Sequence, residues 1–297
     1  MVINVPDEFN FDRCLEFLDR NPTECLHYIE GNSLYKSLKI KNKLLLISIR
    51  CRGKRLKVEV LKGAPDAVLK KEIVGFVRQW FDLDSDLKPF YSHARKDKML
   101  GPLIEKYHGL RVICFPDLFE ALIWSVIAQQ INLGFAYKVK KRFVEAYGES
   151  IRYKGKKYYV FPEPKTISDL SVDELHAMQF SKRKAEYTIG IAKLMANGSL
   201  SKESLLKEAS HSAIEEKLLA IRGIGKWTTQ CVLMKCFAVP SALPIGDAGL
   251  NNAIKIQMNL KTSPTEKEIM RIAKKWNGHN SYSVFYLWRS LLSDEKS

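Results

Sequence analysis

Two helical patterns joined by a glycine-rich corner constrain this chain more than any other feature. Residues 212–222 carry apolar side chains at helical spacing behind a capping-box pattern of Ser212 and Glu215. The corner Gly223-Ile-Gly225 follows, and a second helical pattern begins near Lys226. The sequence therefore predicts a tight helix-hairpin-helix unit.

The corner also predicts a place for a phosphate group. Gly223 and Gly225 can adopt the positive φ of a tight turn, and Ile224 can plug the core beneath it. The first N–H groups of the second helix would then be uncovered between Arg222 and Lys226, which favours an anion. A glycine corner alone is typical of any pair of packed helices. The basic flanks, Thr228 and the net charge together favour a contact with a DNA backbone.

Asp247 is the second notable feature of this stretch. It follows Gly246 and precedes a new apolar helical face that starts at Leu250. Aspartate is a preferred N-cap, so a purely structural role is one interpretation. A capping carboxylate is also held in a fixed position, which suits an acid that must face a developing cation. The two roles are compatible.

The composition narrows the class of partner. Among 297 residues, 48 are Lys or Arg and 33 are Asp or Glu, a formal charge of +15 that favours a polyanion. The six cysteines show no zinc-ligand spacing and predict reduced thiols in a cytosolic protein. No signal peptide and no apolar run long enough for a bilayer is evident, so no membrane partner is expected.

The fold class indicated is α+β. Residues 1–92 predict a small antiparallel sheet with helices, because 37–50 and 54–61 largely alternate apolar and polar residues around Arg52-Gly53. A helix over 67–81 returns across this sheet. Two mostly α-helical lobes follow: residues 117–237 carry the hairpin unit, and residues 93–116 with 238–297 carry Asp247. Helices are predicted at 118–128, 137–147, 171–178, 185–197, 266–276 and 282–292, and a surface hairpin at 150–162.

With these features in hand, the chain resembles the helix-hairpin-helix DNA glycosylase superfamily, specifically its AlkA-type 3-methyladenine glycosylases. Besides the corner and Asp247, the resemblance includes residues 119–130, 180–185 and 281–289 and covers nearly the whole chain. It implies that alkylated bases are flipped out of duplex DNA and that the N-glycosidic bond is cut. It also implies that Asp247 is the catalytic acid and that Trp227, Trp288 and Phe17 line the base pocket.

The resemblance further separates two reaction types. Superfamily members that also cleave the strand carry a lysine nucleophile where this chain has Trp227, and Lys226 is one residue short of that position. A base-releasing enzyme without lyase activity is therefore expected. An oxidised-guanine glycosylase with lyase activity and a non-catalytic hairpin DNA-binding protein are the alternatives.

Several further residues are assigned by the same resemblance. Gln130, with Gln129 beside it, matches the position that fills the gap left by a flipped base, although a solvated glutamine is the simpler interpretation. Cys231 stands where some relatives carry an aromatic pocket residue. Lys182 and Arg183 are candidate DNA contacts, although basic runs are commonly solvated helix faces. The residues expected at the DNA are therefore Gln129, Gln130, Lys182, Arg183, Arg222, Gly223, Ile224, Gly225, Lys226 and Thr228.

The resemblance implies chemistry that needs no catalytic metal. No iron–sulfur cluster is expected either, because such a cluster needs four cysteines near the C-terminus and none follows Cys236. The family implies a monovalent cation at the hairpin carbonyls. The expected partner is double-stranded DNA with alkylated bases. We expect a monomer in the cytoplasm, associated with the nucleoid if the source is bacterial.

Overall fold

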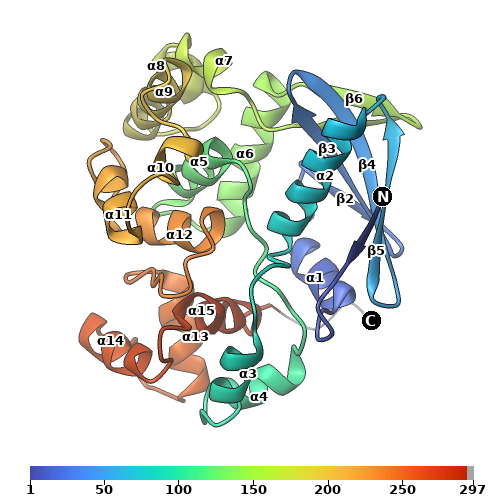
Figure 1. The fold of residues 1–297 in the computed structure, drawn as a ribbon. Coiled ribbons are helices and arrows are strands. Elements are labelled where there is room, and N and C mark those ends of the chain that lie inside the picture. Colours follow the sequence, from blue (N-terminus) through green and yellow to red (C-terminus); the bar gives the residue numbers. More distant parts are fainter. Residues whose placement is uncertain (293–297) are drawn as a thin grey trace.

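A five-stranded antiparallel sheet forms the N-terminal part of the computed structural model, which describes residues 1–292 (Figure 1). The strand order is β1-β5-β4-β3-β2, so every neighbouring pair except β1 and β5 is consecutive in the chain. This confirms the predicted sheet and the turn at Arg52-Gly53. The strands are β1 (Val2–Asn4), β2 (Tyr28–Glu30), β3 (Ser33–Ile40), β4 (Lys43–Arg52) and β5 (Arg55–Lys62).

Strand β4 departs from the predicted alternation in its run from Leu44 to Ile47, because the strand is buried on both faces. Leu45, Ile47 and Ile49 join the core that α2 (Ala67–Trp80) covers. Leu46 points the other way and packs against Ile151 and Tyr158 of a second hairpin.

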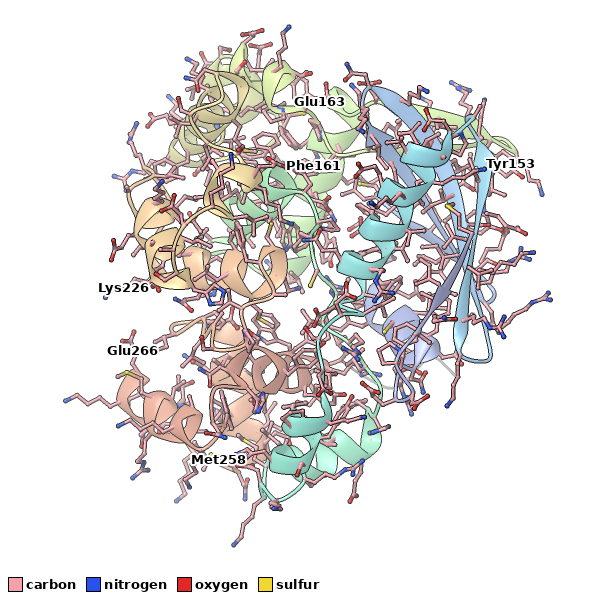
Figure 2. The ribbon with its side chains drawn as sticks, viewed as in Figure 1. Tyr153, Phe161, Glu163, Lys226, Met258 and Glu266 are labelled. Atoms are coloured by element: carbon pink, nitrogen blue, oxygen red, sulfur yellow. The ribbon has the colours of Figure 1, made fainter. Side chains whose placement is uncertain are left out.

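That second hairpin consists of β6 (Ser150–Tyr153) and β7 (Lys156–Tyr159). It turns at Lys154-Gly155 and lies at the surface as predicted, with Arg152, Lys156 and Lys157 exposed, while its other face packs inward. Its apolar residues lie against the N-terminal sheet, and Figure 2 places Tyr153 beside that sheet. Ser37 Oγ also donates to Tyr159 O at 2.6 Å. The hairpin therefore attaches the central helical part to the N-terminal sheet.

Helices make up most of the remaining described chain and confirm the α+β class (Figure 1). Five helices begin at a different residue from the predicted one, and two of them are α8, which begins at Val172, and α15, which begins at Asn280. α6 begins at Leu133 behind Asn132, α9 begins at Lys182 behind Ser181, and α11 begins at His211 behind Ser210. The helix bounds are α1 (Phe11–Leu18), α3 (Lys88–Ala94), α4 (Leu100–Lys106), α5 (Leu118–Ala128), α6 (Leu133–Tyr147), α7 (Pro164–Ser168), α8 (Val172–Ala177), α9 (Lys182–Ala196), α10 (Lys202–Leu205), α11 (His211–Leu219), α12 (Lys226–Cys236), α13 (Ala248–Gln257), α14 (Glu266–Lys274) and α15 (Asn280–Arg289).

The capping box predicted for Ser212 and Glu215 is therefore wrong. Ser210 caps α11 instead, because its hydroxyl accepts from the backbone N–H of Ala213. Three polar residues, Ser210, His211 and Ser212, precede the first apolar residue of the pattern, and the sequence alone did not fix which of them is the cap.

Helix α15 lies at the centre of the molecule and joins its parts. The Tyr282 hydroxyl donates to Asp82 Oδ2 at 2.5 Å, and the Tyr286 hydroxyl donates to the backbone carbonyls of Tyr107 and Leu110. These contacts fix α15 against the segments that follow α2 and α4. They also fix the position of Trp288, two residues after Tyr286 on the same helix.

The domain boundaries at residues 92, 116 and 237 remain predictions, and residues 293–297 lie outside the described chain. Within residues 1–292, no helix has the length and apolar character needed to cross a bilayer.

Candidate active site

Asp247 lies where three elements meet. It is the N-cap of α13, and its Oδ1 accepts from the backbone N–H of Leu250 at 2.7 Å. The same Oδ1 accepts from Trp288 Nε1 of α15 at 2.8 Å, and Oδ2 accepts from Trp227 Nε1 of α12 at 2.9 Å. All three partners are donors, which suits a carboxylate. The capping role is thus present together with two tryptophan contacts.

The backbone around Asp247 depends on two glycines. Gly246 has a φ of +83°, the left-handed region that precedes the cap. A Cβ on Gly249 would lie 3.0 Å from Asp247 Oδ1 and 3.3 Å from Trp288 Nε1. Gly249 therefore leaves room for the indole to reach the acid. Sequence reasoning missed Gly249, because a glycine in the first turn of a helix does not by itself reveal what approaches it.

The hairpin corner confirms part of the prediction. Gly223 has a φ of +94°, and a Cβ there would lie 2.2 Å from the ring of Tyr187. Gly225 has a φ of −96° and is the N-cap of α12, so the prediction of a positive φ at this residue is wrong. Ile224 is 4% exposed and fills the core as expected.

The N-terminus of α12 keeps the features of an anion site. No described side chain caps its first turn, in contrast to the Ser, Asp, Asn or Thr caps of most other described helices. Lys226 is exposed at the outer edge of the helical part (Figure 2). Arg222 is also exposed, and it pairs with Glu186 at 2.6 Å.

Thr228 does not reach the surface with its side chain. It is 1% exposed, and its Oγ1 accepts from Gln129 Nε2 at 3.0 Å. The side chain therefore points inward beneath the corner, and a contact of Thr228 with DNA stays a prediction.

Gln129 and Gln130 have different surroundings. Gln129 Nε2 also donates to Gly223 O at 2.9 Å, so this side chain fastens the end of α5 to the hairpin. Gln130 is exposed and has a φ of +51° at the turn into α6. Lys184 Nζ supports this turn by donating to the carbonyls of Ile127 and Gln129. Only Gln130 is free to enter a duplex.

Lys182 and Arg183 lie in the first turn of α9 and are exposed. Their neighbour Lys184 is bonded to α5, so the three residues of this basic run do not act alike. Lys182 and Arg183 remain candidate DNA contacts.

Phe17 is connected to Asp247 through the side chains of Lys235 and Trp288. Its ring lies 4.4 Å from that of Phe285 on α15, and Lys235 Nζ lies 5.7 Å from its centre. The same ammonium lies 5.6 Å from the centre of Trp288. Cys231 lies one turn before Lys235 and is buried, and this burial raises the pKa of its thiol.

Gln230 is a further residue that sequence reasoning missed. Its Nε2 donates to Glu215 of α11, and its Oε1 accepts from the N–H of Leu243 in the segment before Asp247. The amide therefore connects both hairpin helices to the loop that presents the acid. Within the described chain, no three His, Cys, Asp or Glu side chains gather as a metal site.

Comparison with known proteins accounts for this arrangement. Residues 123–278 match the model of the HhH-GPD superfamily base excision DNA repair proteins, and residues 1–116 match the AlkA N-terminal domain. A DNA-3-methyladenine glycosylase of Bacillus subtilis is 45% identical over 98% of this chain and 97% of its own length.

Solved structures share the fold. A 3-methyladenine DNA glycosylase from Archaeoglobus fulgidus aligns with a TM-score of 0.83 at 20% identity, over 97% of both chains. An 8-oxoguanine glycosylase/lyase of Clostridium acetobutylicum, in complex with double-stranded DNA, aligns with a TM-score of 0.75 at 18% identity, over 98% of this chain and 97% of its own. The chain belongs to the HhH-GPD superfamily of base excision DNA repair proteins.

Proposed function

We propose that this chain is a monofunctional DNA glycosylase that excises alkylated purines, such as 3-methyladenine and 7-methylguanine, from double-stranded DNA. The observation that carries the proposal is the carboxylate of Asp247, held by two indole N–H groups beside an uncapped hairpin helix. The name of the Bacillus subtilis relative supports the same substrate class.

The hydrogen bonds indicate which oxygen of Asp247 acts on the substrate. A carboxylate offers about four lone-pair positions, two on each oxygen. Oδ1 accepts two bonds, from Leu250 and Trp288, whereas Oδ2 accepts one, from Trp227. Oδ2 is thus the oxygen with an open position. It stabilises the cationic sugar that forms as the N-glycosidic bond breaks, or it orients the attacking water.

The two tryptophans suit an alkylated purine. Their N–H edges are turned to Asp247, and both indoles are partly exposed beside it. An N3- or N7-alkylated purine nucleotide carries a positive charge, is a good leaving group and stacks well on an electron-rich indole. Base flipping places such a purine beside the acid.

Lyase activity is the alternative within this superfamily, and two observations disfavour it. The α12 side chain that reaches Asp247 is Trp227, which is not a nucleophile. Lys226 is exposed on the outer edge of the hairpin, one residue earlier. The expected product is therefore an abasic site in an intact strand.

Three finer points complete the proposal. The chain acts as a monomer, in the cytoplasm with the DNA. The hairpin carbonyls would hold a monovalent cation, because the carbonyl oxygens of Ile221 and Gly223 each accept one hydrogen bond and keep a second lone pair.

Asp247→Asn tests the proposal. Asparagine keeps an oxygen for the N-cap but removes the charge and presents an amide to one indole N–H. We expect base release to fall by about 10³-fold or more while affinity for duplex DNA changes little. Release is measured by chromatography of bases freed from methylated duplex DNA, and affinity by fluorescence anisotropy.

Asp66→Asn is the matched control, because Asp66 caps α2 through the N–H of Leu69 and lies outside the site. It should leave base release unchanged. Undiminished release by Asp247→Asn would contradict the catalytic assignment and favour a non-catalytic DNA-binding protein. Strand breaks without added alkali would contradict the monofunctional assignment.

A further inference from the structure

Lys235 is a buried lysine on the face of α12 that carries the site. It follows Trp227 by eight residues and Cys231 by four, so the three side chains lie on one side of the helix. Helical side chains lean toward the N-terminus of their helix, which directs Lys235 toward Cys231 and the acid.

The ammonium of Lys235 lies inside a cage of aromatic rings. Its Nζ is between 5.3 and 5.7 Å from four ring centres. One of these rings is the indole of Trp288, whose N–H binds Asp247. The four rings belong to Phe17, Phe115, Phe285 and Trp288.

This ammonium has no protein partner within residues 1–292. Lys235 is 9% exposed, yet no hydrogen bond or ion pair joins its Nζ to a described residue. The carboxylate of Asp247 already accepts hydrogen bonds from two indole N–H groups and one backbone N–H. Burying an ammonium without a hydrogen-bond acceptor is costly, and aromatic faces offset only part of that cost. Such a group is available for a ligand.

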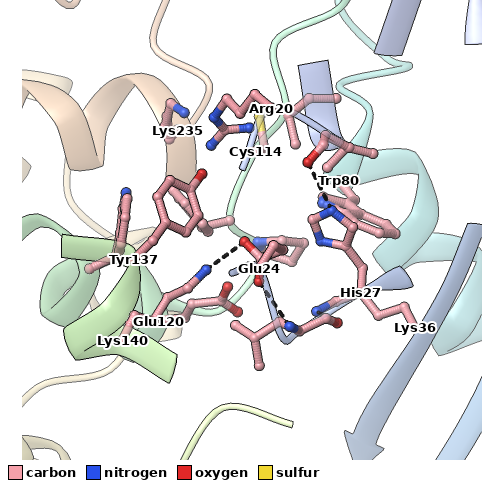
Figure 3. A pocket seen from close by; sticks show the side chains of 16 residues that line it. Arg20, Glu24, His27, Lys36, Trp80, Cys114, Glu120, Tyr137, Lys140 and Lys235 are labelled. Carbon is pink, nitrogen blue, oxygen red and sulfur yellow. Dashed lines mark hydrogen bonds and ion pairs between the residues drawn. The ribbon is translucent and has the colours of Figure 1, made fainter. Parts of the chain in front are cut away.

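Lys235 also borders a polar cavity of about 30 Å³ between the N-terminal and helical parts, enough for about two water molecules. Figure 3 shows Lys235 and Arg20 next to each other on one side of this cavity and Lys36 on the opposite side. Cavity water can solvate the ammonium before a base arrives. Arg20, a like charge, cannot pair with it.

We propose that Lys235 is a specificity-determining residue of the base pocket, which donates a hydrogen bond to acceptor atoms of an uncharged base and repels a base with a fixed positive charge. The inference rests on the proposed function, since it concerns the base stacked beside Trp288 and Asp247. It concerns the balance between cationic alkylated purines and neutral purines with an acceptor edge, for which hypoxanthine serves as the probe.

The pKa of Lys235 provides an independent measurement. Burial, and then the charge of Arg20, lowers this pKa to about 8, while Cys231, Cys114 and Asp247 act in the opposite direction. The side chains of α15 that face Nζ, Phe285 and Trp288, are uncharged. Above pH 8 Lys235 loses its proton, so its repulsion of a cationic base should weaken. The hydrogen bond to a neutral base then comes from an uncharged amine instead of an ammonium.

The test compares the release of 7-methylguanine and of hypoxanthine from otherwise identical duplexes under single-turnover conditions. In Lys235→Met, hypoxanthine release should fall by about 10-fold or more, because a charged donor is lost. Release of 7-methylguanine should rise by about 10-fold, because a like charge is removed. Lys235→Gln keeps a donor without the charge, so it should gain on 7-methylguanine and keep part of its activity on hypoxanthine.

Lys36→Met is the matched control. Lys36 is 7% exposed, and its Nζ lies 5.4 Å from the centre of Trp80, but it donates to Leu26 O and does not contact Trp288. This variant should leave the ratio of the two rates unchanged. The wild-type ratio of 7-methylguanine to hypoxanthine release should rise as the pH passes about 8, and this rise should be absent in Lys235→Met.

The outcomes separate the two proposals. If the wild type releases methylated purines and Lys235→Met alters both rates by the same factor, Lys235 only fills its cage and the inference is wrong while the glycosylase assignment stands. The inference is also wrong if the ratio does not change with pH. Release of neither base by the wild type overturns the proposed function itself.

Discussion

Asp247 combines a structural and a chemical role in one side chain. Its Oδ1 caps α13 and accepts from Trp288, so the oxygen that stabilises the helix also positions the indole. Asp247 thereby depends on residues that lie 20 positions before it and 41 positions after it. A change that moves either indole should move the carboxylate as well.

Gly249→Ala tests this dependence at a residue with no chemistry of its own. The new Cβ would crowd Asp247 Oδ1 at 3.0 Å and Trp288 Nε1 at 3.3 Å, so one of them must shift. Misplacing a catalytic group by a fraction of an ångström to one ångström slows reactions strongly, and we expect base release to fall by about 10- to 100-fold. The melting temperature should stay within a few degrees, since alanine favours a helix.

Gly190→Ala in α9 is the corresponding control, because nothing lies within 4 Å of its Cβ position. It should leave base release unchanged. Equal rates for wild type and Gly249→Ala would show that the bond between Trp288 and Asp247 does not position the acid.

For the single residue Asp247, the sequence predicted the helix cap but not the hydrogen bonds from Trp227 and Trp288. A cap is local, because the acceptor and the N–H of Leu250 lie within one turn. The indole bonds require that α12, α13 and α15 converge, and that convergence depends on core packing along the whole chain. For the same reason Lys235 was not distinguished from the other basic residues.

Among the elements, the hairpin of α11 and α12 depends on two glycines that act differently. Gly223 has a left-handed φ, and because it lacks a Cβ it leaves the space that the ring of Tyr187 occupies. Gly225 has an ordinary φ and an open Cβ position. Gly223 therefore serves the fold, whereas Gly225 leaves the start of α12 accessible to a phosphate.

Replacing each glycine by alanine should separate these roles. Gly223→Ala should lower the free energy of unfolding by about 2–4 kcal/mol, because it combines a strained φ with a clash. Gly225→Ala should lower it by no more than about 1 kcal/mol, but affinity for duplex DNA should fall by about 10-fold, because a methyl group blocks close approach of the backbone. Chemical denaturation and fluorescence anisotropy measure the two effects. Full DNA affinity in a folded Gly225→Ala variant would contradict a phosphate site at α12.

Most long elements were predictable because their apolar periodicity is strong, as in α5, whose bounds match the predicted 118–128. Errors arose where a cap lies inside a polar stretch. Asn132 caps α6, which begins four residues before the predicted start, and Ser181 caps α9 before a basic first turn. Short helices such as α3, α7 and α10 have too few residues to show a period.

Across the whole molecule, the polar cavity joins parts that the sequence does not connect. Glu24 and Lys140 form an ion pair of 2.6 Å across 116 positions, and His27 Nε2 lies 3.2 Å from Leu18 O. The sequence predicted a sheet domain and helical lobes but not this interface, because its charged residues look like solvated surface positions until the parts are packed.

His27 makes the stability of this interface depend on pH. Burial lowers its pKa from 6.5 to about 4, and Lys36 and Lys140 act in the same direction, while Glu24 opposes them. Between pH 4 and 6.5 the unfolded chain binds a proton that the folded chain does not, so stability rises with pH across this window and is complete above it. Lowering the pH from 7 to 4 should remove about 2 kcal/mol through this residue, allowing for its partial exposure.

Thermal and chemical unfolding between pH 4 and 7 measure this dependence, and His27→Gln supplies the comparison. Glutamine can still donate to Leu18 O but does not titrate, so the variant should show a shallower loss of stability between pH 6.5 and 4. Burial raises the pKa of Glu24, but the charge of Lys140 outweighs it and holds this pKa well below its ordinary value of 4.5. The stability from that ion pair is therefore lost as the pH falls below about 4.5, in the wild type and in His27→Gln alike, so the difference between the two proteins reports His27. Identical slopes for the variant and the wild type would mean that His27 is already solvated in the folded protein, and the interface would then not be closed around it.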